Sequence, residues 1–202
     1  FGWDWGPRLV SSGLWRPVFL TTWNTARIEN VQFVQNSVSE EVAELTARFE
    51  IESEANKKAT LTIENDGIIL ATQSIKLEKG TQIYHVDFKI DNPKLWWTNG
   101  LGEAHLYNLK AKVTVGKAST ELDDRIGIRT IELVRDKDEH GTTFYFKVNG
   151  TPVFMKGANY IPNDVFPARV TDDMYRNVIN TAKTSNMNML RIWGGGIYEY
   201  DI

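Results

Sequence analysis

The sequence predicts a mainly β protein, in which a two-layer β-sandwich is followed by a strand, a helix and a second strand. The first observation is a series of six or seven short segments between residues 25 and 128 in which apolar and polar side chains alternate. The second is that clusters of Gly, Asn, Asp and Pro separate these segments, as turns do. The third is that apolar residues recur at helical spacing after residue 170. Strands of this number and length favour a sandwich of immunoglobulin type.

The alternation is clearest where Leu45, Ala47, Phe49 and Ile51 fall on one face of a predicted strand. The run Asn65-Asp66-Gly67 predicts a tight turn between two further strands. Two sheets that close over their apolar faces leave one polar face each. The predicted strands of the sandwich span residues 26–34, 43–51, 59–64, 68–77, 83–90 and 105–115.

The composition excludes several classes of function. The chain has 202 residues, a net charge of −3 and no cysteine. This charge gives no broad basic field for nucleic acid, and no apolar run approaches the roughly 20 residues of a membrane span. The three histidines, His85, His105 and His140, are far apart in the sequence. We therefore expect no nucleic-acid partner, no membrane insertion, no metal and no cofactor.

The opening run, Phe-Gly-Trp-Asp-Trp-Gly-Pro, carries the strongest chemical signal in the chain. Trp3 and Trp5 flank Asp4, and glycines and a proline bracket the three. The face of a sugar ring packs on a flat indole, and a carboxylate between two indoles accepts strong hydrogen bonds from hydroxyls. From composition alone the run is more typical of a buried turn in which both tryptophans serve as core packing.

The last third of the chain changes in character. Asn149-Gly150 predicts the turn of a hairpin between residues 144–148 and 152–156. An apolar strand then ends near Tyr160, and Thr171 is a suitable N-cap for an amphipathic helix. A second apolar run, residues 187–193, follows the helix. This order of strand, loop, helix and strand predicts a βαβ unit.

Polar and aromatic residues gather where the two strands of this unit end. Asn159 and Asp164 follow the first strand, and Arg191 and Trp193 close the second. Active sites of (β/α)8 barrels form at the carboxyl ends of their strands. These four residues are therefore candidates for a binding site, and for Arg191 and Trp193 the alternative is a packed core with a structural ion pair.

Several runs resemble the β-mannosidases of glycoside hydrolase family 2. They are FGWDWGPRLVSSGLWRPV at residues 1–18, PKLWW at 93–97, KGANYIPND at 156–164 and RIWGGG at 191–196. The resemblance implies three parts: the end of a jelly-roll sugar-binding domain (1–24), an immunoglobulin-like sandwich (25–128) and the first βαβ part of a (β/α)8 TIM barrel (129–202). Residues 13–20 then read as a turn and the last strand of the jelly roll.

The resemblance also implies roles for individual residues. Asp4 is expected to hydrogen-bond sugar hydroxyls in the cleavage subsite, with Trp3 and Trp5 shaping the pocket wall. Trp193 is expected to line the same subsite, and Arg191 to hold the active-site carboxylates. Asn159 and Asp164 are further expected pocket residues.

The implied reaction is hydrolysis of terminal β-D-mannosides from oligosaccharides or glycans with retention. Such enzymes use two carboxyl groups about 5–5.5 Å apart, and in this family both are glutamates on later barrel strands. We therefore read the chain as a fragment that lacks both glutamates and is inactive alone. Its truncated edges are expected to allow self-association. The compartment stays open between exported, periplasmic and lysosomal.

Two other readings remain at this stage. The chain is a non-catalytic carbohydrate-binding module if Trp3, Trp5, Trp96 and Trp97 act as stacking plates, although we favour packing of the Trp96–Trp97 loop against a neighbouring domain. Alternatively, the enzyme class holds and the sugar is galactose, glucuronic acid or glucosamine, as in a β-galactosidase or a β-glucuronidase. The βαβ unit argues against the binding module, and the opening run argues for mannose.

Overall fold

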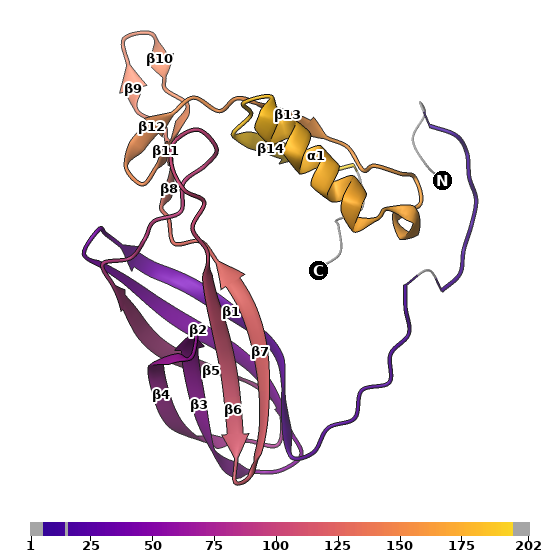
Figure 1. Cartoon of the computed structure of the whole chain (residues 1–202), viewed down its shortest axis with the longest axis vertical. Helices are drawn as coiled ribbons and strands as arrows, with labels where there is room; N and C mark the ends of the chain where they lie inside the picture. Colours follow the sequence, from indigo (N-terminus) through magenta and orange to yellow (C-terminus); the bar gives the residue numbers. More distant parts are fainter. Residues whose placement is uncertain (1–5, 15, 196–202) are drawn as a thin grey trace.

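The computed structural model describes residues 6–14 and 16–195, and two antiparallel sheets form a sandwich in its lower part (Figure 1). One sheet has the strand order β1-β2-β5 and the other β4-β3-β6-β7. The predicted mainly β class with an immunoglobulin-like sandwich is confirmed. The strands are β1 (Ala26–Val38), β2 (Val42–Ser53), β3 (Lys57–Asn65), β4 (Ile68–Leu77), β5 (Gly80–Asp91), β6 (Tyr107–Val115) and β7 (Ala118–Ile126).

The core of the sandwich lies between these two sheets and follows the alternation of the sequence. Every second side chain of β2 is buried, and Phe49 and Ile51 have no exposed surface. β3 and β6 contribute Leu61, Ile63 and Leu109 from the opposite sheet, each also fully buried. Because side chains alternate across a strand, the same pattern places polar residues on the outer faces.

Two of the turns have the geometry that their sequences predict. Asp66 and Gly67 join β3 to β4 with φ angles of 47° and 83°. Asn149 and Gly150 join β11 (Tyr145–Val148) to β12 (Thr151–Val153) with φ angles of 49° and 75°. Positive φ at both central residues matches the right-handed twist of a hairpin, and Asn, Asp and Gly tolerate it best.

The edge strand β7 was not among the predicted strands. Its sequence is rich in charged and polar residues, and its side chains are mostly exposed. Only Leu122 and Ile126 pack against the core. An edge strand that covers little core needs few apolar residues, so its alternation is weak.

The short strand predicted within residues 13–20 is wrong. Residues 7–14 and 16–23 contain neither helix nor strand, and they run away from the sandwich as an extended segment (Figure 1). Leu14 and Leu20 are 92% and 93% exposed. A strand needs a hydrogen-bonded neighbour, and none of the described residues pairs with this segment.

A small sheet follows the sandwich. It contains β8 (Ile131–Val134), β11 and β12 in the order β12-β11-β8, with Val134, Val148 and Val153 buried. The predicted hairpin is thus confirmed. A short hairpin of β9 (Lys137–Asp138) and β10 (Gly141–Thr142) extends from this sheet (Figure 1).

The predicted βαβ unit is also confirmed. β13 (Gly157–Tyr160) pairs in parallel with β14 (Met189–Ile192), and α1 (Asp172–Thr184) connects them after a short 3-10 turn, Pro167–Arg169. The Thr171 side chain accepts a hydrogen bond from the Met174 amide at 3.4 Å. Thr171 is therefore the N-cap of the helix.

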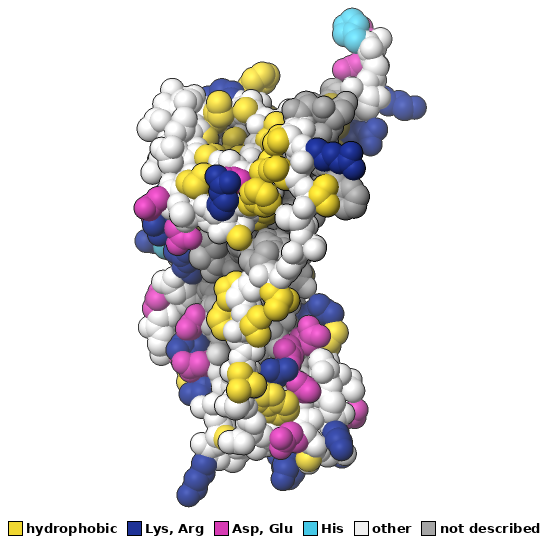
Figure 2. Space-filling model, turned by 90° about the vertical axis from the view of Figure 1, so that its right-hand side faces the viewer, with side chains coloured by type: hydrophobic (Ala, Val, Ile, Leu, Met, Phe, Trp, Pro, Cys, Tyr) yellow, Lys and Arg dark blue, Asp and Glu magenta, His cyan; other side chains and the backbone are white. Residues whose placement is uncertain are grey.

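The surface of the sandwich is charged but mixed in sign. Lys and Arg alternate with Asp and Glu over its lower part (Figure 2). Such a surface has no single-sign field that would attract a polyanion. Within the described residues, no helix combines the length and apolar character needed to cross a membrane.

Removing a large core side chain tests the importance of the sandwich. We expect Phe49→Ala to lower the free energy of unfolding by about 3–5 kcal/mol, because the ring is fully buried and leaves a cavity. Urea unfolding followed by circular dichroism measures the change. Ile69→Ala is the control, since Ile69 is 62% exposed and should cost less than about 1 kcal/mol. Equal losses in the two variants would contradict this view of the core.

Candidate functional site

The candidate site lies at the carboxyl edge of the β13–β14 pair. The parallel register places Asn159 opposite Arg191 and Tyr160 opposite Ile192. Both strands run in the same direction, so their last residues reach the same edge. Two segments that are 32 residues apart in sequence are thereby joined in one place.

Arg191 and Asn159 contact each other directly. Nη1 of Arg191 donates a hydrogen bond of 3.1 Å to Oδ1 of Asn159, and both residues are exposed. A guanidinium carries five N–H donors in a rigid fork. One hydrogen bond to a neighbouring amide orients the guanidinium. Its other N–H groups can form a bidentate pair with a carboxylate.

Trp193 follows the last residue of β14. Its backbone amide donates to the Tyr160 carbonyl at 3.0 Å, which continues the pairing of the two strands by one step. Its side chain is half-buried. The structure thus brings Asn159, Arg191 and Trp193 to one edge, as the sequence predicts.

Asp164 has a clear structural contact within its own loop. Its Oδ1 accepts a hydrogen bond of 2.8 Å from the Phe166 amide, and its Oδ2 lies 3.1 Å from Nη2 of Arg169. The carboxylate side chain is only 16% exposed. These contacts hold the loop after β13 in shape, while the predicted pocket role of Asp164 stays a prediction. Trp3, Asp4 and Trp5 lie outside the described residues.

The loop of residues 92–106 connects the sandwich to the later part of the chain. Its Trp96 carbonyl accepts a hydrogen bond from Nδ2 of Asn149 at 3.0 Å, and the guanidinium carbon of Arg129 lies 4.6 Å from the centre of the Trp96 ring. The packing of this loop against the neighbouring part of the chain is therefore confirmed. Such cation–π contacts favour a fixed ring orientation.

Each tryptophan of this loop packs against a glycine. A Cβ on Gly127 would lie 2.8 Å from the Trp96 ring, and a Cβ on Gly102 would lie 2.8 Å from the Trp97 ring. These distances are too short for carbon atoms, so only glycine fits without displacing a ring. Both rings are half-buried, and these contacts cover surface that a sugar-stacking plate would need.

Gln35 is a contact residue that the sequence does not reveal. Its side chain donates to the Gly127 carbonyl at 3.2 Å and accepts from the Arg129 amide at 3.0 Å. This pair of bonds joins β1 to the segment that leaves the sandwich. Residues more than 90 positions apart carry no shared local pattern, so no signal in the sequence points to this pairing.

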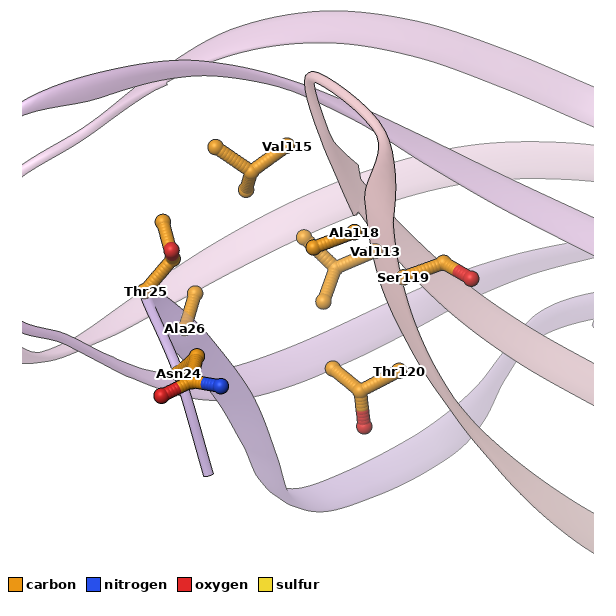
Figure 3. A pocket seen from close by; sticks show the side chains of 8 residues that line it. All are labelled: Asn24, Thr25, Ala26, Val113, Val115, Ala118, Ser119 and Thr120. Carbon is orange, nitrogen blue, oxygen red and sulfur yellow. The ribbon is translucent and has the colours of Figure 1, made fainter.

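One hollow on the sandwich is lined by Lys58 and Lys76, on β3 and β4, and contains no aromatic ring. A shallow crevice opens between the start of β1 and the β6–β7 hairpin (Figure 3), and it contains no charged side chain and no aromatic ring. No group of three or more potential metal ligands is found in the described parts of the chain. The crevice is lined by Asn24, Thr25, Ala26, Val113, Val115, Ala118, Ser119 and Thr120.

The perturbed ionisable groups also lie on the outer surface of the sandwich. A hydrogen bond from Lys89 lowers the pKa of the Glu44 carboxyl, and the same bond raises the pKa of Lys89. A hydrogen bond to Glu121 raises the pKa of Lys110 in the same way. Solvent screens such exposed ion pairs, which makes them surface contacts rather than acid–base machinery.

Comparison with known proteins identifies the class. The family model described as "Glycosyl hydrolases family 2" matches residues 26–129. The chain therefore belongs to glycosyl hydrolase family 2, as the sequence motifs indicate.

Several curated relatives are named β-mannosidases. Beta-mannosidase B of Aspergillus clavatus is 36% identical over 205 residues, and the match covers all of this chain but 24% of the relative. Beta-mannosidase of Capra hircus is 34% identical over 214 residues with the same coverage of each protein. The chain thus spans about a quarter of the length of the curated relatives it matches.

Solved structures agree in fold. The β-D-mannosidase of Dictyoglomus thermophilum superposes with a TM-score of 0.89 and 38% identity, covering 98% of this chain and 25% of that one. The exo-chitosanase CsxA of Amycolatopsis orientalis superposes with a TM-score of 0.72 at 20% identity, covering 86% of this chain and 20% of that one. The second likeness shows the fold alone.

The contact between Trp96 and Gly127 predicts a specific sensitivity. We expect Gly127→Ala to lower the free energy of unfolding by about 1–3 kcal/mol, because the new methyl group displaces the Trp96 ring. Thermal unfolding followed by tryptophan fluorescence measures this loss. Gly194→Ala is the control, since nothing lies within 4 Å of its Cβ position. A Gly127→Ala protein as stable as the control would show that close packing at Trp96 does not require glycine.

Proposed function

We propose that this chain is part of a retaining exo-glycosidase that removes terminal β-D-mannosyl residues from oligosaccharides or glycans. The observation that supports the proposal most is the Arg191–Asn159 contact at the carboxyl edge of two parallel strands. Whole-chain similarity to proteins named β-mannosidase supports the choice of sugar. Membership of a glycosyl hydrolase family supports a carbohydrate substrate.

In this proposal the chain supplies recognition and support rather than the reacting carboxylates. Retaining glycosidases use one carboxyl group as acid and base and a second as nucleophile, about 5–5.5 Å apart. The family resemblance assigns both roles to glutamates on later barrel strands, and we propose that neither is among these 202 residues. The 202-residue chain alone is then expected to show no turnover.

The candidate residues have separate roles in this scheme. Arg191 is a fixed cation at the strand edge, suited to holding a carboxylate in its reactive orientation. Trp193 provides an apolar plate for the sugar ring beside it. Asp4, between Trp3 and Trp5, accepts hydrogen bonds from hydroxyls that differ in orientation between sugars. Binding energy from such remote groups lowers the barrier only if it is realised in the transition state.

The proposal divides the chain into three parts. Residues 1–24 belong to a sugar-binding domain, 25–128 form the sandwich, and 129–202 begin a (β/α)8 catalytic barrel. The parallel β13–α1–β14 unit supports the last assignment, because parallel barrels are built from such units. Asn159 and Asp164 then lie on the loop side of the first barrel strand, where pocket residues are found in this fold.

The first test concerns the opening motif. We expect the enzyme containing this chain to cleave an aryl β-mannoside in preference to the β-galactoside and the β-glucuronide. Asp4→Ala should lower kcat/KM on the mannoside roughly 100-fold, because two charge-assisted hydrogen bonds are lost. Asp123→Ala, on an exposed edge strand of the sandwich, is the control. Preference for another sugar, or indifference to Asp4→Ala, would remove the mannosidase assignment while the family remains.

The second test concerns the strand edge. Arg191→Lys keeps the positive charge but loses the planar fork that bonds Asn159. We expect kcat/KM to fall at least about 10-fold in Arg191→Lys and further in Arg191→Ala, by the loss of one to two charge-assisted bonds. Steady-state hydrolysis of the same aryl β-mannoside measures both.

Arg176→Ala is the matched control for these variants. Arg176 is an exposed arginine of α1 that pairs with Asp173 on the helix surface, so its loss should leave hydrolysis unchanged. An Arg191→Lys enzyme with full activity would show that charge alone suffices and that the fork has no role.

A further inference from the structure

Two polar side chains of the loop of residues 92–106 form hydrogen bonds to residues 183–188, at the end of α1 and before β14. Oγ1 of Thr98 donates a hydrogen bond of 2.7 Å to the backbone carbonyl of Asn188. Thr98 is 6% exposed, one of two buried polar side chains in the described part of the chain. Burying a hydroxyl without a hydrogen-bond partner costs free energy, so the bond strongly favours a fixed position of Thr98 relative to Asn188.

Asn99 makes the second contact. Its Nδ2 donates to the carbonyl of Lys183 at 3.1 Å and to the carbonyl of Met187 at 3.0 Å. Lys183 lies in the last turn of α1, and its carbonyl also accepts a hydrogen bond from the Asn186 amide at 3.1 Å, just beyond the helix end. Asn99 therefore caps the end of a helix that belongs to a different part of the fold.

Asn188, the residue held by Thr98, in turn organises the start of the parallel pair. Its Oδ1 accepts from the Lys156 amide at 2.8 Å, and its Nδ2 donates to the Phe154 carbonyl at 3.0 Å. Its own amide donates to the Lys156 carbonyl at 2.9 Å. One residue thus ties the start of β14 to the chain that enters β13.

The loop that carries Thr98 is itself fixed on the sandwich. The Trp96 amide donates to the Ile128 carbonyl at 2.7 Å, and the Trp97 amide donates to the Glu103 carbonyl at 2.9 Å. Ile128 is fully buried in the sandwich core. The sandwich therefore fixes the position of this loop. The Thr98 and Asn99 side chains of the loop then hold the end of α1 and the start of β14 by hydrogen bonds.

We infer that Thr98 and Asn99 are positioning residues, through which the sandwich sets the placement of Arg191 and Asn159 at the strand edge. Arg191 lies three residues beyond Asn188, about 10 Å along an extended strand. A shift of the Asn188 corner moves the β13–β14 pair relative to the sandwich, and with it the Arg191–Asn159 contact. The inference rests on the proposed function only in calling that edge a sugar site, and the placement itself is tested without sugar.

Amide hydrogen exchange on the 202-residue chain tests the placement. We expect Thr98→Val and Asn99→Ala to speed exchange about tenfold at Asn188, Met189 and Trp193, since each removes hydrogen bonds that hold this corner. Exchange at Leu61 and Ala111, in the centre of the sandwich, should stay unchanged. A generally destabilised protein would instead show faster exchange in both regions, and that outcome overturns the inference.

Two further variants control for the loss of a polar side chain. Thr98→Ser keeps the hydroxyl and should restore protection at Asn188 and Met189, whereas Thr98→Val does not. Asn36→Ala removes an exposed hydrogen bond to Thr46 within the sandwich and should leave the strand edge unaffected. Failure of Thr98→Ser to restore protection would show that the hydroxyl is not the cause.

The side-chain resonances of Arg191 and Asn159 give a signature at the site itself. In Thr98→Val and Asn99→Ala, the NMR signals of the Arg191 guanidinium and the Asn159 amide should shift, and in Thr98→Ser and Asn36→Ala they should not. Unchanged signals in all variants would overturn the inference. Because no sugar is present, this failure is separate from a failure of the proposed function, which would appear only in the hydrolysis assays.

Discussion

The closure of two sheets over their alternating apolar faces is the constraint on which the rest of the molecule depends. Phe49, Ile51, Leu61 and Leu109 have no exposed surface, and they fix both sheets against each other. The loop of residues 92–106 is anchored to this core through Ile128. Every contact to the later part of the chain starts from a loop or strand whose position the core has already determined.

The sandwich and the βαβ unit differ in the side chains that they present. The sandwich has a charged, mixed surface without a ring cluster or acid pair suited to chemistry, whereas the βαβ unit brings a cation, an amide and an indole to one strand edge. The match to the model of glycosyl hydrolase family 2 covers the sandwich, at residues 26–129. Under the proposed function, the contribution of the sandwich is to position this edge rather than to contact substrate.

The sequence predicted what depends on local pattern and failed where distant pairing decides. β4 was predicted at its observed bounds, because alternation and an Asp-Gly turn both mark it. β7 escaped detection since it buries little, and the strand within residues 13–20 was wrong because no described segment pairs with it. The Asn159–Arg191 edge was predictable from parallel strand order, but the Gln35 and Thr98 contacts join residues 90 or more positions apart.

The sandwich and the βαβ unit are consecutive in the sequence, but the hydrogen bond from Asn99 to the end of α1 joins them. A recombination that joined this sandwich to the helix and strands of a distant relative near Ile128 would separate the loop from the carbonyl groups it satisfies. Each half of such a chimera would keep its own fold, but the hydrogen bonds between the two halves would be lost. Residues 92–106 and 183–188 therefore form a block that evolution, or a protein engineer, would have to exchange together.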